Sequence, residues 1–65
     1  MKTLILKALE DRYNAQISEA EATLKIYFEN SVGIGEHPDI IAAIDEQIGI
    51  AATAEEKLKY INGVK

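Results

Sequence analysis

The sequence predicts an all-α protein in which two amphipathic helices form an antiparallel hairpin, and the hairpin assembles into a dimeric four-helix bundle or a higher oligomer. Apolar residues recur at helical spacing, every three or four residues, in two long segments. A short segment rich in Asn, Ser and Gly separates them and is typical of a turn. Neither segment shows the long alternation of apolar and polar residues that a strand needs. Residues 1–65 are therefore expected to form a single helical-hairpin domain.

The first predicted helix covers residues 2–29. This segment contains neither proline nor glycine, the two residues that most weaken a helix interior. Polar residues such as Lys7, Asn14 and Lys25 occupy the side opposite an apolar face, as expected for a helix with one buried side. That apolar face consists of Leu6, Leu9, Tyr13, Ile17, Ala20, Leu24, Tyr27 and Phe28.

The predicted turn covers residues 30–37. It contains Asn30, Ser31, Gly33 and Gly35, residue types that favour turns through local hydrogen bonds or unusual backbone angles. A connection this short places the two flanking helices side by side and antiparallel.

The second predicted helix covers residues 38–62. Pro38 suits the first helical turn, where its missing N–H costs nothing, and it restricts His37 to extended backbone. Asp39 follows in the first turn, where the helix dipole favours a negative charge. Asn62 and Gly63 predict the end of the helix, because glycine readily adopts the left-handed conformation that caps a helix.

The apolar arc of the second helix is broader than one partner helix can cover. Ile41 and Ile48 flank its central stripe on one side, and Ile50 flanks it on the other. We therefore expect the chain to associate with itself. The predicted core and oligomer interface consists of Leu6, Leu9, Tyr13, Ile17, Leu24, Ile40, Ile41, Ile44, Ile48, Ala51 and Leu58.

Folding the chain back at the turn sets a register between the helices. It brings bulky Tyr13 near small Ala51 and Ala54, and such matching of large with small side chains favours a packed interface. A register one helical turn away stays open. Glu55 then lies opposite Tyr13, either in a hydrogen bond with it or reaching solvent at the interface edge. The paired positions are Leu24 with Ile44, Ile17 with Ala51, Leu9 with Leu58, and Leu6 with Ile61 or Asn62.

Two features of the helices concern small residues. Ala8, Ala15 and Ala22 recur every seven residues on the back of the first helix. They are either a seam for a closely packed second helix or surface residues chosen for their helix propensity. Gly49 lowers helix propensity by about 1 kcal/mol relative to alanine. A close helix crossing at Gly49 would explain its presence.

Size and composition narrow the possible functions. A chain of 65 residues buries roughly 60% of its unfolded surface, and the absence of cysteine excludes disulfides and thiol chemistry. The formal net charge is −4 and the pI is about 4.8, which disfavours binding to nucleic acid or to an anionic membrane. The apolar run at residues 4–6 is too short for a signal peptide or a membrane span. We therefore expect a soluble cytoplasmic protein.

The sequence shows no recognisable catalytic, cofactor or metal site, and we expect a protein that is not an enzyme. Gly33 and Gly35 precede a helix as in phosphate loops, but no strand comes before them and the neighbouring acids would repel phosphate. A structural turn is the preferred interpretation. His37 with Glu36 and Asp39 could supply half of a metal site, whereas a surface histidine at a helix start is the simpler interpretation.

Three stretches, residues 26–30 (IYFEN), 32–39 (VGIGEHPD) and 42–45 (AAID), form a pattern of turn followed by helix. This pattern is similar to that of small uncharacterised helical-hairpin proteins of tailed bacteriophages and covers about half of the chain. The resemblance implies a virus-encoded protein made in the cytoplasm of a host bacterium. It implies no catalytic or binding residues.

The leading functional hypothesis is a non-enzymatic protein–protein interaction module whose first partner is a second copy of the chain. If the chain is phage-encoded, a host protein is a further candidate partner. One alternative is an acidic inhibitor that mimics nucleic acid and binds a host enzyme. Another is a ligand- or metal-binding bundle with a site formed between chains. The sequence also leaves open whether the hairpin closes on itself or exchanges helices between chains.

Overall fold

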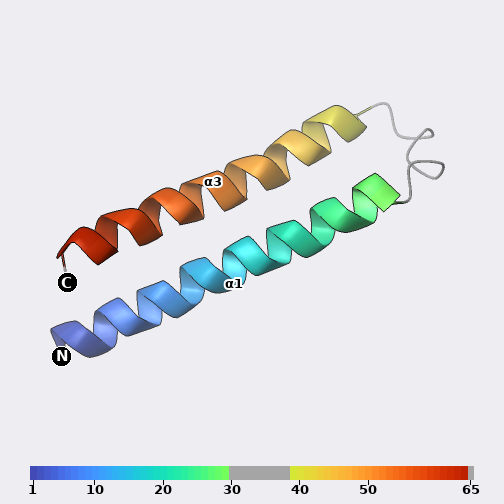
Figure 1. Cartoon of the computed structure of the whole chain (residues 1–65). Coiled ribbons are helices and arrows are strands. Elements are labelled where there is room, and N and C mark those ends of the chain that lie inside the picture. Colours follow the sequence, from blue (N-terminus) through green and yellow to red (C-terminus); the bar gives the residue numbers. More distant parts are fainter. Residues whose placement is uncertain (30–38, 65) are drawn as a thin grey trace.

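Two long helices make up the described structure. The computed structural model describes residues 1–29 and 39–64, with α1 spanning Lys2–Glu29 and α3 spanning Ile40–Val64. The helices run antiparallel and pack along their length, so that the two ends of the chain lie at the same end of the molecule (Figure 1). This arrangement, with no strand in the described ranges, confirms the predicted all-α hairpin.

Backbone hydrogen bonds mark the beginning of each helix. The Met1 carbonyl accepts a hydrogen bond from the Ile5 N–H, and the Asp39 carbonyl accepts one from the Ala43 N–H, each with an N···O distance of 3.0 Å. Each carbonyl thus accepts the first helical hydrogen bond, which places Met1 and Asp39 at the N-cap positions. The predicted helix start at Pro38 lies outside the described residues.

The C-terminal end of α3 differs from the prediction. Gly63 was expected to cap the helix in a left-handed conformation, but the helix continues through Val64, and no described glycine has a positive φ. The expected cap at Gly63 was therefore wrong. Glycine in a helix costs conformational entropy but keeps its N–H and carbonyl, so the last turn can extend through it.

The core of the hairpin is a narrow seam between the helices. Along both helices the buried and half-buried residues alternate spacings of three and four, which is the heptad pattern of a two-stranded coiled coil. Glu10 and Gln47 occupy seam positions although they are polar. The seam consists of Leu6, Glu10, Tyr13, Ile17, Ala20, Leu24 and Tyr27 of α1, and Ile40, Ile44, Gln47, Ala51, Ala54, Leu58 and Ile61 of α3.

The elongated shape leaves this core incompletely buried. The molecule measures 49 × 14 × 13 Å and has a Cα radius of gyration of 15.0 Å, whereas a globular domain of this length has a radius of about 11 Å. Among the described residues only Ala20 and Ala54, each 1% exposed, and Ile61, 7% exposed, are buried. The rest of the seam is half-buried, because each helix has a single neighbour.

Candidate interaction surface

The position of Tyr13 shows which parts of the two helices face each other. The Lys57 Nζ atom lies 5.5 Å from the centroid of the Tyr13 ring, and Tyr13 lines a surface hollow together with Ile61. These positions place Tyr13 beside the last two turns of α3, and the choice between the predicted register and one a helical turn away stays a prediction. The almost complete burial of Ala54 fits the packing of a large ring against a small side chain.

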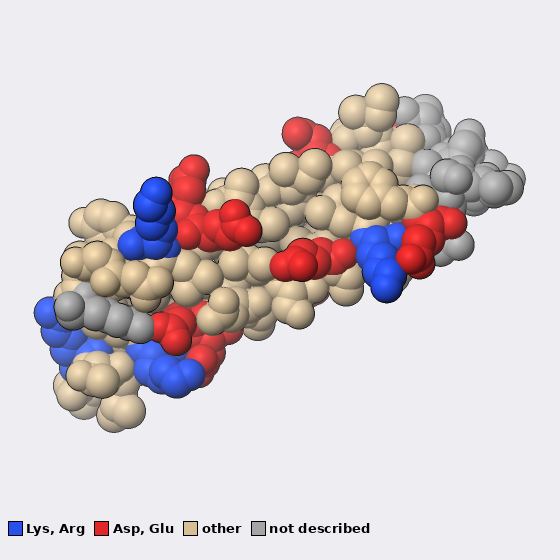
Figure 2. All heavy atoms as spheres, viewed as in Figure 1, with Lys and Arg blue, Asp and Glu red and all other residues tan. Residues whose placement is uncertain are grey.

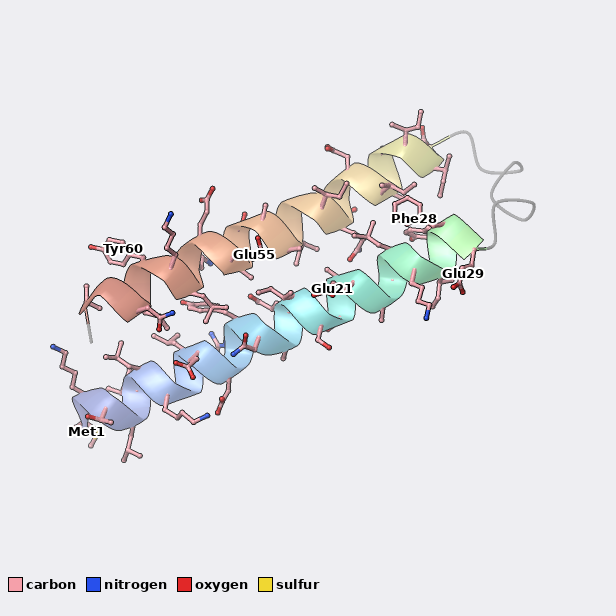
Figure 3. All side chains as sticks on the ribbon, viewed as in Figure 1. Met1, Glu21, Phe28, Glu29, Glu55 and Tyr60 are labelled. Carbon is pink, nitrogen blue, oxygen red and sulfur yellow. The ribbon has the colours of Figure 1, made fainter. Side chains whose placement is uncertain are left out.

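The structure decides between the two alternatives for Glu55. Among the described residues, Tyr13 and Glu55 form no hydrogen bond. Glu55 is exposed. Lys57 is two positions further along α3, so the two side chains leave the helix in nearly opposite directions. Glu55 therefore reaches solvent at the edge of the seam (Figure 3), and the hydrogen-bond alternative was wrong.

The predicted interface residues fall into two groups. Ile41 and Ile48 are 79% and 50% exposed, because no helix of the same chain covers their side of α3. Their place in an oligomer interface stays a prediction. The other nine are half-buried in or beside the seam: Leu6, Leu9, Tyr13, Ile17, Leu24, Ile40, Ile44, Ala51 and Leu58.

One broad face of the hairpin, which we call the charged face, is the face seen in Figure 2. Lys, Arg, Asp and Glu side chains are distributed along it (Figure 2), and Glu21 and Glu55 lie on it (Figure 3). Of the residues that border the seam on this face, the exposed large apolar ones are Phe28, Ile41 and Ile48, all in the half next to residues 30–38. The residues that border the seam on this face at heptad spacing are Lys7, Asn14, Glu21, Phe28, Ile41, Ile48, Glu55 and Asn62.

The opposite broad face, which we call the Ile50 face, has a different composition. A hollow on this side brings Gln16 of α1 together with Ile50 and Lys57 of α3, and is also lined by Glu46, Gly49 and Thr53. Lys2 and Lys57 are the two charged residues among those that border the seam here. At heptad spacing these residues are Lys2, Leu9, Gln16, Thr23, Ala43, Ile50, Lys57 and Val64.

The outer side of α1 carries the three alanines singled out in the sequence. Ala8, Ala15 and Ala22 are exposed, and Leu4 and Ile26 beside them are 71% and 58% exposed. α3 packs on the other side of α1, so the alanines take no part in the hairpin. Whether they form a seam with another helix or are surface residues stays open.

Charge is distributed unevenly along the hairpin. The half next to residues 30–38, taken as residues 17–29 and 39–51, carries six acidic residues and one basic residue, a net charge of −5. The half that holds the chain ends, residues 2–16 and 52–64, carries four acidic and five basic residues, a net charge of +1. The hairpin is therefore acidic at one end and weakly basic at the other.

An ion pair lies on the exposed side of α1. The Lys7 Nζ atom lies 2.5 Å from a carboxylate oxygen of Asp11, and both side chains are more than half exposed. The hydrogen bond to Asp11, followed by the attraction of its charge, raises the pKa of Lys7 above its ordinary value of 10.5. The stabilisation is thus complete below pH 10.5 and lost as the pH rises through the raised pKa. Solvent screening keeps it small.

Gly49 lies in the middle of α3 with free space around it. A Cβ atom added there would have no neighbour within 4 Å, and the backbone of Gly49 does not have a positive φ. No described element of the same chain therefore crosses close to Gly49, and a close crossing by a helix of a second chain stays a prediction.

Neither a cluster of metal ligands nor a membrane-spanning helix is found among the described residues. No group of three or more His, Cys, Asp or Glu side chains among them could hold a metal ion. Neither described helix has the combination of length and apolar character needed to cross a membrane. Gly33, Gly35, Glu36 and His37, the residues considered for an anion loop or a metal half-site, lie outside the described residues.

Comparison with protein-family models, with curated proteins and with solved structures finds no match to this chain.

Proposed function

We propose that this chain is a non-enzymatic interaction module and that its first partner is a second copy, with which it forms a four-helix bundle. The observation that best supports the proposal is the large solvent-accessible surface area of the single chain. The chain exposes 5093 Å², whereas a monomeric protein of 7.2 kDa exposes about 4100 Å². The excess of about 1000 Å² is close to the roughly 800 Å² that each partner contributes to a standard protein–protein interface.

The exposed side chains support the same proposal. Small domains without disulfides or metals usually need a partner chain or very good helix packing to be stable. Here the seam is only half-buried, and burying an exposed Ile or Phe side chain contributes about 1.5–3 kcal/mol. The large apolar residues left exposed are Met1, Leu4, Ile5, Ile26, Phe28, Ile41, Ile48, Ile50, Tyr60 and Val64.

The biological setting is part of the proposal. The resemblance to small hairpin proteins of tailed bacteriophages supports a phage-encoded protein that works in the host cytoplasm, with a host protein as a second partner. The acidic-inhibitor hypothesis makes a separate prediction: the chain would compete with DNA for a basic host protein. A ligand or metal site between chains would appear as a thermal shift with divalent metal that His37→Ala removes.

The solution mass tests the central proposal. Light scattering on a sizing column, with circular dichroism at each concentration, should show a helical species of about 14 kDa or a larger multiple of the 7.2 kDa chain. Helicity should fall on dilution, because a separated hairpin loses the contacts that bury its seam. A 7.2 kDa species that keeps full helicity from millimolar to low micromolar concentration would contradict self-association.

A further inference from the structure

We infer that the second copy covers the Ile50 face, and that the two hairpins lie with their Glu29 ends pointing in opposite directions. This inference rests on the proposed self-association and specifies its surface and its geometry.

The choice of face follows from the residues that border the seam. A helix in a four-helix bundle contacts two neighbours, so a third apolar or uncharged position per heptad must face the second neighbour. On the Ile50 face two of the eight bordering residues are charged, Lys2 and Lys57, and both lie in the half that holds the chain ends. On the charged face three of eight are charged, namely Lys7, Glu21 and Glu55. Charged residues are depleted in the centre of protein interfaces, which favours the Ile50 face.

The choice of orientation follows from the charge along the hairpin. Two copies with their Glu29 ends together would place two halves of charge −5 side by side. In the opposite orientation each half of charge −5 faces a half of charge +1. Complementary charge favours the second arrangement, and like charge disfavours the first.

A two-fold axis that lies in the interface, perpendicular to the helices and across the middle of the Ile50 face, produces this dimer. It covers the Ile50 face of both copies and points their Glu29 ends in opposite directions. Because the axis reverses the helix direction, α1 packs against α1 of the second copy and α3 against α3. With the axis near Gln16, Leu9 of one copy faces Thr23 of the other. Glu46 of one copy then comes close to Lys57 of the other, and symmetry makes this ion pair twice. Lys57 is already held on this face by its contact with the Tyr13 ring.

The charged face does not match itself in this orientation. Its apolar residues, Phe28, Ile41 and Ile48, lie near the Glu29 end. Reversal would place Phe28 against Lys7, Ile41 against Asn62 and Ile48 against Glu55 of the second copy. Burying apolar side chains against charged ones leaves the charges without water or a partner, which is costly.

Two substitutions in the same helix test the choice of face. Ile50 and Ile48 are 40% and 50% exposed, but they lie on opposite faces. Ile50→Lys should raise the dimer Kd by at least about a hundredfold, because it places ammonium groups in the centre of the interface. Ile48→Lys should change the Kd by less than about threefold. If the Ile48→Lys variant were monomeric and the Ile50→Lys variant remained a stable dimer, the inference would be overturned.

A charge exchange tests the contact between copies. Glu46→Lys and Lys57→Glu should each weaken the dimer by about tenfold, because two attractive pairs become repulsive. The double variant should recover most of the affinity, since the pairs are restored with the charges exchanged. If the affinity losses of the two single variants instead add up in the double variant, the two residues lie apart in the dimer. That result would overturn the two-fold arrangement.

A distance measurement tests the orientation without altering either face. The sequence has no cysteine, so Glu29→Cys gives one spin label per chain. Pulsed electron paramagnetic resonance should give a label separation of about 40 Å, as expected when thirteen helical residues lie on each side of the axis. A separation below about 25 Å would place the Glu29 ends together and refute the orientation. A wild-type monomer would instead refute the proposed function itself.

Discussion

Replacing Gly49 with alanine should stabilise the protein, and this substitution separates two explanations for a glycine in mid-helix. The structure leaves the site open: no atom lies within 4 Å of the added Cβ, and the backbone φ is not positive. The substitution therefore introduces neither a clash nor backbone strain. It removes the entropy cost of ordering glycine, which is about 0.8–1.0 kcal/mol in a helix interior.

A gain of this size should be measurable in so small a protein. For a chain of this length, 1 kcal/mol corresponds to a rise in Tm of about 4–8 °C. Thermal unfolding followed by circular dichroism should be done at one fixed chain concentration, because the Tm of an oligomer depends on concentration. Ala52→Gly is the matched control. This exposed residue lies one turn further along α3, and replacing it with glycine should lower the Tm by a similar amount.

The opposite outcome would also be informative. If Gly49→Ala lowers the Tm or reduces the oligomer mass while Ala52→Gly behaves as expected, the reasoning from open space is wrong. A second chain must then approach the α3 backbone at Gly49 more closely than a methyl group allows. Gly49 lines the hollow on the Ile50 face, so this second chain would be the copy that the inferred two-fold arrangement places there.

Three further predictions concern the seam and are measured by urea unfolding at fixed chain concentration. Ile61→Ala should lower the free energy of unfolding by about 2 kcal/mol or more. Its control is Tyr60→Ala, at a residue 74% exposed, which should change the free energy of unfolding by less than about 0.5 kcal/mol. Equal losses in the two variants would contradict the burial of Ile61. Ala20→Leu should lower the free energy of unfolding by about 1–3 kcal/mol, because the larger side chain overfills the seam. Ala22→Leu, on the outer side of α1, is the control and should leave the free energy of unfolding nearly unchanged. No loss in Ala20→Leu would mean that the seam is loosely packed. Tyr13→Phe should leave stability unchanged, and a clear loss would show that the hydroxyl has a partner.

The sequence was sufficient to predict the hairpin because the apolar spacing and the turn residues act locally. The register that matches Tyr13 with Ala54 uses only side-chain size and the length of the connection, and it stays a prediction. Glu10 and Gln47 were not predicted as part of the seam, because each interrupts the apolar pattern. The heptad spacing on both sides of each residue would have placed them there.

One expectation, the cap at Gly63, failed, and another, the place of Ile41 and Ile48 in an oligomer interface, stays a prediction; both used residue preferences without their surroundings. Gly63 is a common type of helix cap, but preference for a left-handed conformation does not oblige a glycine to adopt it. Ile41 and Ile48 were chosen for the interface from the arc of one helix alone. The charges that share their face, such as Glu21, belong to the other helix, so their effect is visible only once the register is known.

The way the two helices pair also has a consequence for the order of folding. In an antiparallel hairpin the contacts nearest the connection join residues close in sequence, such as Leu24 and Ile44, whereas Leu6 and Ile61 are far apart. Closing the longer loop first costs about 0.9 kcal/mol more. We therefore expect pairing to start near residues 24 and 44 and to proceed toward the chain ends. Destabilising Ile44 should then slow folding, whereas destabilising Ile61 should mainly speed unfolding.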